Sequence, residues 1–129
     1  MEENSAEPIQ KNGEIEKSIK HLIVEIIEYI PNAVLSRTII KKLTGNITAM
    51  AFDSGEEIGE RSVPFDTYIQ IIDGEAKVTV DNEEHHLKIG DGIVIPAHSF
   101  HKFNAKEQFK MISTVIKSGY ESQIVFPAN

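Results

Sequence analysis

The sequence predicts a single all-β domain, built as a barrel or a sandwich and preceded by one amphipathic helix. A chain of 129 residues has the length of one domain, and 40% hydrophobic with 26% charged residues is an ordinary globular composition. After Pro31 the chain consists of about eight to ten short β-rich runs separated by turn residues, which is typical of antiparallel sandwiches and barrels. Before Pro31, apolar residues recur at helical spacing.

The N-terminal part is expected to contain a flexible segment and then the helix. Residues 1–13 carry few large apolar side chains, and we expect them to be flexible in solution. Residues 14–30 place apolar side chains at steps of three and four, which predicts one helix with a continuous apolar stripe. Pro31 ends this helix, because the residue before a proline avoids the α region. The stripe consists of Ile15, Ile19, Leu22, Ile23, Ile26, Ile27 and Ile30.

Residues 31–129 are predicted to form the β-domain. Alternation is clear on residues 109–115, where every second side chain is expected to line the barrel or its core. Strands are expected, in chain order, at residues 34–43, 46–52, 67–72, 75–80, 84–89, 93–96, 100–105, 108–117 and 123–126. The expected turns are Asp53-Ser54-Gly55, Asp73-Gly74, Asp81-Asn82 and Gly90-Asp91-Gly92.

Charge and composition argue against several classes of partner. The chain has 13 Lys and Arg against 20 Asp and Glu, a net charge of −7, whereas a nucleic-acid binder needs a basic face. The absence of cysteine excludes disulfides, thiolate metal sites and a cysteine nucleophile. The N-terminus is acidic and polar, unlike a signal peptide, and no run approaches the roughly 20 apolar residues of a membrane span. We therefore expect a cytoplasmic protein that binds neither nucleic acid nor membranes.

Two stretches resemble the paired motifs of the cupin superfamily. GDGIVIPAHSFHKFN, residues 90–104, is similar to the second motif, with Gly90, Pro96 and His101 in place and His98 where the motif has a glycine. GEEIGERSVPFDTYIQIIDGE, residues 55–75, is similar to the first motif and is anchored by its first and last motif glycines. The resemblance covers about residues 34–117. It implies a cupin-type double-stranded β-helix, which is a jelly-roll barrel, and a homodimer, for which the apolar stripe of the predicted helix offers a second argument.

The metal ligands of the family are largely missing at the corresponding positions. Those positions are occupied by Arg61, Val63, Thr67 and His101. Arginine only donates hydrogen bonds, valine offers no ligand atom, and threonine is a weak ligand for a divalent ion. A catalytic metal site ordinarily has at least three protein ligands. We therefore expect a cupin barrel without the usual metal and without another cofactor.

A rebuilt metal site is an alternative that the sequence leaves open. It would combine His98 and His101 with a carboxylate, either Glu60 or Asp66. Residues three apart on a strand face opposite sides, so His98 would join His101 only if the chain turns between them. Glu60 would face the same cavity only if its strand bulges.

The candidate ligand-binding residues are Arg61, Thr67, His98, His101 and Phe103. Arg61 and His101 would place a guanidinium and an imidazole in an apolar cavity, where arginine binds carboxylates through two parallel hydrogen bonds. Phe103, two residues after His101, would share its face and form an aromatic wall. We therefore predict that the barrel binds a small organic ligand, such as a carboxylate, without the usual metal.

Two other functions are alternatives to this prediction. One is a metal-dependent cupin enzyme of the oxygenase or isomerase type, which the resemblance implies and which would use the rebuilt site of His98 and His101. The other is a metal-free isomerase or epimerase with His101 as the general base. The sequence shows no acid partner for His101 at matching spacing, although Asp66 and Tyr68 are close, and it assigns no catalytic residue.

Overall fold

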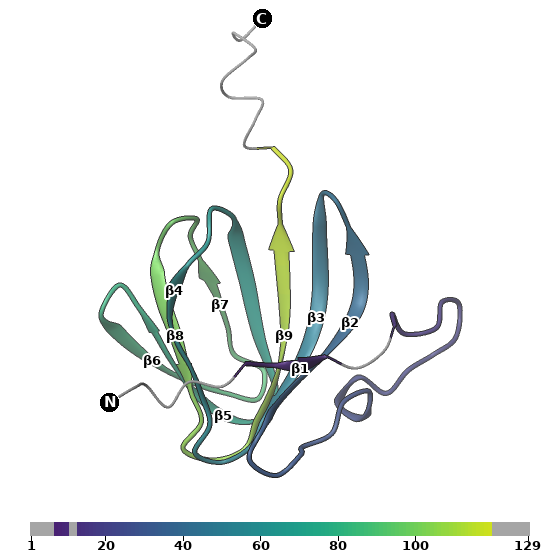
Figure 1. Ribbon diagram of the computed structural model, residues 1–129, viewed down its shortest axis with the longest axis horizontal. Helices are drawn as coiled ribbons and strands as arrows, with labels where there is room; N and C mark the ends of the chain where they lie inside the picture. The colour runs from purple at the N-terminus through teal and green to yellow at the C-terminus, as the bar shows by residue number, and fades with distance from the viewer. Residues whose placement is uncertain (1–6, 11–12, 120–129) are drawn as a thin grey trace, which may run out of the picture.

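The computed structural model describes residues 7–10 and 13–119, which form one curled sheet of nine strands (Figure 1). The expected strand at 123–126, like most of the segment 1–13 expected to be flexible, lies outside the described residues. No described helix is long and apolar enough to cross a membrane. The elements are β1 (Ile9–Gln10), a 3₁₀ turn η1 (Ile23–Glu25), β2 (Val34–Lys42), β3 (Gly45–Phe52), β4 (Glu57–Ser62), β5 (Asp66–Val80), β6 (Glu83–Lys88), β7 (Gly92–Ile95), β8 (Phe100–Asn104) and β9 (Phe109–Ile116).

Strand β5 is the centre of the architecture because it belongs to both halves of the curled sheet (Figure 1). Its first part pairs with β9 and β7, and its second part pairs with β6 and β8. Strands β3 and β2 continue the first half beyond β9, and β4 continues the second half beyond β8. These pairings are all antiparallel, whereas β1 pairs with β2 in parallel. The predicted all-β class is confirmed.

The turn that we predicted at Asp73-Gly74 does not exist, and this prediction is wrong. Residues 66–80 form one strand, whose register with β9 shifts between Ile71 and Asp73. Gly74 has a φ of 73°, a backbone conformation that glycine adopts at little cost. An extra residue in one strand bends that strand and increases its twist. The bend carries β5 from one half of the sheet into the other.

The other predicted turns are present and depend on residues that tolerate positive φ. Asp81 and Asn82 have φ values of 48° and 71°, as the tight connection between β5 and β6 requires. Gly55 follows β3 with a φ of 85°, and the amide of Glu56 donates to the Asp53 carbonyl at 3.1 Å. The expected strands between residues 34 and 117 are confirmed, apart from the merging of 67–72 with 75–80.

The barrel interior is filled by apolar side chains from both halves of the sheet. On β9 the inward face is the one that the alternation predicts, with Phe109 and Met111 fully buried. Phe52 and Phe109 stack with ring centres 4.3 Å apart, and Phe103 lies beside them. The buried members of this core are Val34, Phe52, Ile58, Ile69, Ile71, Ala76, Val78, Leu87, Ile95, Phe103, Ala105, Phe109 and Met111.

The amphipathic helix that we predicted at residues 14–30 is absent, and this prediction is wrong. The segment is irregular, with the single 3₁₀ turn at Ile23–Glu25, and Ser18 has a φ of 67°. Its isoleucines are β-branched, which lowers helix propensity, and a short helix depends on tertiary packing for its stability. Here packing favours another conformation: Ile26 and Ile27 are buried against the outer face of β2 and β3.

Side chains of the sheet hold this segment by its backbone. The Lys110 ammonium donates to the Val24 carbonyl at 2.6 Å and lies 5.0 Å from the centre of the Tyr29 ring. The guanidinium of Arg37 donates to the carbonyl of Ile26 at 2.9 Å. Tyr29 donates its hydroxyl proton to Asp73 at 2.6 Å, and burial together with this carboxylate raises the pKa of the tyrosine. Two carbonyls that a helix would pair internally, those of Val24 and Ile26, are therefore paired with side chains of the sheet.

Replacing Lys110 by methionine is expected to loosen residues 23–30 from the sheet. The substitution leaves the Val24 carbonyl without its charged donor, and a hydrogen bond to a charged group contributes about 1.5–3 kcal/mol. Hydrogen exchange should accelerate at amides 23–30, and urea unfolding should show a loss of stability of that size. The control is Lys106→Met, which removes an exposed lysine elsewhere. Unchanged exchange in Lys110→Met would contradict the role of this contact.

A candidate ligand-binding cavity in the barrel

A cavity of about 330 Å³ opens into the barrel between its two halves. Strands β3, β4, β5, β8 and β9 line it, together with the segment that connects β4 to β5, Pro8 before β1 and Lys117 after β9. None of the described side chains that line it is acidic. Its polar and charged lining residues are Asn46, Arg61, Thr67, His101, Ser113 and Lys117.

The depth of each residue in the cavity follows from strand register and burial. In the first half of the sheet, Thr67 pairs with Val115, and Ile69 pairs with Ser113 one step deeper. Met111 lies deeper still and is 1% exposed, as is Ile69. Along β9 the lining thus changes from a thioether at the floor to a hydroxyl and then to valine toward the rim.

The opposite wall also changes from apolar side chains at the floor to polar ones toward the rim. Phe103 pairs with Ile58 at the floor, where the two side chains are 6% and 3% exposed. Nearer the rim, His101 pairs with Arg61, and only the arginine is exposed. The floor is therefore apolar, and the polar groups of this wall lie at the rim and just below it.

A bulge in β4 decides which side chain lies opposite His101. The register shifts by one residue between Ile58 and Arg61. Without that extra residue, the pairing of Ile58 with Phe103 would place Glu60 opposite His101. With it, Arg61 takes this position and lines the cavity, whereas Glu60 is exposed and outside it. The strand does bulge, but the bulge brings Arg61 rather than Glu60 into the cavity lining, so the expectation that a bulge would bring Glu60 to His101 is wrong.

His101 is a buried imidazole, 6% exposed, with an unsatisfied nitrogen. Its Nδ1 atom is buried and has no hydrogen-bond partner among the described residues. The ring meets Phe103 edge to face, with centres 5.6 Å apart. Burial lowers the pKa of His101; the Arg61 charge acts in the same direction. The Ser99 backbone lies near enough to favour the charged form, although it does not reach Nδ1 with hydrogen-bond geometry.

The folded-state pKa of His101 is expected to lie below the ordinary value of 6.5 and to rise in Arg61→Ala. Because folding depresses this pKa, the contribution of neutral His101 to stability is complete above pH 6.5 and is lost as the pH falls through the folded-state pKa. An NMR titration of the imidazole resonances, assigned with His101→Phe, measures the shift. A midpoint at or above 6.5 would contradict the proposed burial.

His98 is not part of the cavity. It is exposed with a φ of 72°, and its amide donates to the Val63 carbonyl at 2.7 Å. The chain does turn between His98 and His101, but the turn leaves the side chain of His98 outside the lining. The structure therefore brings together Arg61, Thr67, His101 and Phe103 of the predicted set and leaves His98 apart.

The donor set at the family's metal position does not fit a divalent ion. Around His101 the inherited positions hold Arg61, Val63 and Thr67, of which only the threonine has an oxygen. Asp66, the other carboxylate considered, is exposed and accepts from the Ala97 amide at 2.8 Å. Within residues 7–10 and 13–119 no three His, Cys, Asp or Glu side chains are grouped as a metal site would require.

Two of the polar lining residues, Lys117 and Asn46, were not predicted from the sequence. Lys117 continues the inward alternation of β9 by one step beyond Val115, and this alternation was the signal that could have identified it. Its ammonium lies 5.8 Å from the centre of the Phe65 ring. Asn46 lies at the level of Val115, because the two residues pair across β3 and β9. No local signal in the sequence marks Asn46 as a lining residue.

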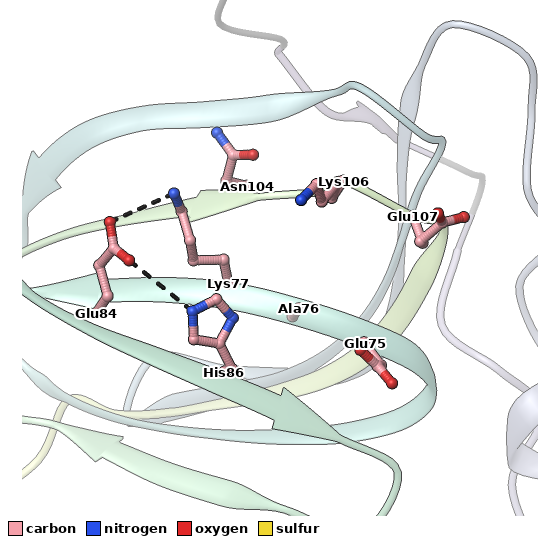
Figure 2. Close-up of a pocket in the computed structure, with 8 residues that line it drawn as sticks. All are labelled: Glu75, Ala76, Lys77, Glu84, His86, Asn104, Lys106 and Glu107. Atoms are coloured by element: carbon pink, nitrogen blue, oxygen red, sulfur yellow. Dashed lines mark ion pairs between the residues drawn. The ribbon is translucent and has the colours of Figure 1, made fainter.

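A second hollow, of about 260 Å³, lies over residues of β5, β6 and β8 and the connection to β9 (Figure 2). Figure 2 shows Glu84 between Lys77 and His86, with ion-pair distances of 3.4 Å and 3.9 Å. Acidic and basic groups neutralise each other here; Glu84 and His86 are exposed to solvent, and Lys77 is partly exposed. The barrel cavity, with cations and no acid in its described lining, is the better candidate site.

Comparisons with known proteins agree with this architecture. A conserved protein of unknown function from Streptococcus pyogenes is 31% identical, with a TM-score of 0.78 over 90% of this chain and 99% of that one. A cupin superfamily protein from Desulfitobacterium hafniense is 27% identical, with a TM-score of 0.76 over 82% and 97% of the two chains. A cupin 2 conserved barrel domain protein from Leptotrichia buccalis is 30% identical, with a TM-score of 0.71 over 73% and 46%.

A search of the curated proteins found no significant match. The family model for the cupin domain matches residues 49–115, which span both motifs and all the inward residues of β4, β5, β8 and β9 named above except Lys117. With this match and the structural relatives, the expected cupin-type jelly-roll barrel is confirmed, and the chain belongs to the cupin superfamily.

Proposed function

We propose that the barrel cavity binds a small organic molecule through a carboxylate, without the metal of the family. The observation that carries this proposal is the charge of the cavity. Arg61 and Lys117 line it, no described lining residue is acidic, and neither cation forms an ion pair with another described residue. A cation beside an apolar cavity attracts an anion more strongly than one in open water, because the dielectric is lower.

Replacing Arg61 by alanine is expected to weaken carboxylate binding by about tenfold or more. A hydrogen bond to a charged group contributes about 1.5–3 kcal/mol, which corresponds to about a tenfold to hundredfold change in Kd. A set of small monocarboxylates is first screened for an increase in Tm, and each hit is then titrated by calorimetry into the wild type and the variant.

The matched control for this experiment is Lys102→Ala. Lys102 is exposed on β8 beside His101, so the variant loses the same charge on the opposite face of the strand. Its Kd should equal that of the wild type. If no monocarboxylate raises Tm, or if hits bind Arg61→Ala with undiminished affinity, the proposed function is wrong.

Proton transfer by His101, as in a metal-free isomerase, is a second candidate function. The observation that favours it is the buried imidazole of His101. Burial lowers its pKa, which favours the neutral form that a general base requires. Such an enzyme also needs an acid on the other side of the substrate. Asp66 and Tyr68, the neighbouring candidates, are both exposed and do not line the cavity. This geometry supports ligand binding rather than catalysis.

Assembly as a homodimer, which the sequence predicts, stays a prediction.

A further inference from the structure

The cavity has three chemically different levels, and together they describe its ligand in more detail than a single carboxylate. At the rim are the two cations, Arg61 and Lys117. Just below the rim is the buried imidazole of His101. The floor is formed by Phe103, Met111 and other apolar side chains. A ligand that matches all three levels has an anionic head, one polar group near that head, and an apolar body.

His101 and Arg61 are neighbours in the lining of the cavity. The two residues are direct partners across β4 and β8, and such partners have Cα atoms about 4.5–5.5 Å apart. Both side chains line the cavity, so one small ligand can contact both of them. A ligand whose carboxylate is bound by Arg61 can therefore present a second polar group to His101.

The chemistry of His101 selects the second polar group. His101 lines the cavity, and a neutral imidazole has one nitrogen that donates and one that accepts. A ring nitrogen that loses its water on burial is favoured to pair with a polar group, so a ligand group that pairs with the ring is favoured. A hydroxyl both donates and accepts, and it therefore matches either tautomer. A second carboxylate would instead have to be desolvated beside the aromatic wall.

The floor of the cavity requires the rest of the ligand to be apolar. Ile58, Ile69, Phe103 and Met111 are all at most 6% exposed and present no side-chain polar group. A polar substituent that reached them would lose its water without gaining a hydrogen bond. The cavity volume of about 330 Å³ lies at the lower end of the roughly 300–1,000 Å³ of small-molecule sites, enough for a compact ring or branched chain.

We infer that the ligand is a hydroxy acid with an apolar body. The carboxylate is held at the rim by Arg61 and Lys117, the hydroxyl pairs with His101, and the apolar body lies against Phe103 and Met111. This inference rests on the proposed function and deepens it.

The experiment compares three probes by calorimetry at pH 7.5, where the buried imidazole is neutral. The probes are 2-hydroxy-3-phenylpropanoate, its deoxy analogue 3-phenylpropanoate, and malate, which has the hydroxyl and carboxylate without the apolar body. We expect the hydroxy acid to bind about threefold to tenfold more tightly than the deoxy analogue, the net effect of one hydrogen bond. Malate should bind at least tenfold more weakly, because it offers no apolar surface to the floor.

The same titrations in His101→Phe attribute the hydroxyl preference to the imidazole. Phenylalanine fills the space without ring nitrogens, so both phenyl acids should bind this variant with equal affinity. His98→Phe is the matched control, because His98 is exposed and outside the cavity, and its preference should equal that of the wild type. A circular-dichroism melt establishes that each variant is folded before titration.

The outcomes separate this inference from the proposed function. If both phenyl acids bind the wild type equally and Arg61→Ala weakens both, the carboxylate site stands and the hydroxyl inference is overturned. A hydroxyl preference that persists in His101→Phe also overturns it, because another side chain then binds the hydroxyl. If malate binds as tightly as the phenyl acid, the apolar body is not recognised. If no monocarboxylate binds at all, the proposed function itself fails.

Discussion

Replacing Phe52 by alanine is expected to lower the free energy of unfolding by about 3–5 kcal/mol, the range for deleting a fully buried phenylalanine. Phe52 is 0% exposed, and its ring stacks on Phe109 with an interplanar angle of 15°. It also contacts Phe103 at 6.1 Å between ring centres. The substitution therefore removes the middle member of three packed rings and leaves a space that rigid strands on both sides cannot close.

Urea unfolding, followed by circular dichroism, measures this loss. The matched control is Phe100→Ala on β8, because Phe100 is 55% exposed and its removal leaves no internal space. A loss in Phe52→Ala no larger than that of the control would contradict the packing described above. Since Phe103 forms part of the cavity floor, Phe52→Ala is also expected to weaken ligand binding, although Phe52 does not line the cavity.

Replacing Gly74 by alanine is expected to destabilise the fold by about 2–4 kcal/mol, because two costs combine. The backbone has a φ of 73°, which L-residues with a side chain rarely adopt. A Cβ at this position would also overlap the carbonyl oxygen of Gln108 and lie 2.9 Å from the Cα of Phe109. These are backbone atoms, which cannot rotate away. Strand β5 would have to shift at the point where it passes between the two halves of the sheet.

Gly55→Ala is the control that separates these two costs. Gly55 has a φ of 85°, but nothing lies within 4 Å of a Cβ added there. It therefore reports the cost of positive φ alone, which is about 1–2 kcal/mol. Thermal and urea unfolding of both variants give the difference due to the overlap. Equal losses in the two variants would show that the backbone at Gly74 relaxes easily.

Several site residues could be predicted from local sequence because strand geometry is local. The cupin-like motif predicted that His101 faces inward, the spacing of two placed Phe103 on the same face, and the structure places both in the cavity lining. The inward face of residues 109–115 was predicted from the same alternation. In each case the period of the backbone alone relates neighbouring side chains, so no distant contact had to be known.

The N-terminal segment shows why periodicity alone is not enough to predict a helix. Isoleucines at steps of three and four suit one face of a helix, but only Ile26 and Ile27 of the stripe are buried. The backbone of this segment instead receives hydrogen bonds from Lys110 and Arg37. Lys110 is 86 residues distant from its partner carbonyl, and no local pattern reports such a contact.

The sequence by itself determined the all-β class, the turns at Asp81-Asn82 and Gly90, and the cupin framework. The resemblance to the cupin motif predicted that His101 faces the barrel, and alternation placed Phe103 on the same face, because side-chain alternation and turn preferences are properties of neighbouring residues. Only the tertiary structure decided that Arg61 rather than Glu60 lies opposite His101, that Lys117 joins the rim, and that residues 14–30 are not helical. These three features depend on contacts between residues that are far apart in the sequence. Such contacts are formed only when the sheet curls and brings those residues together.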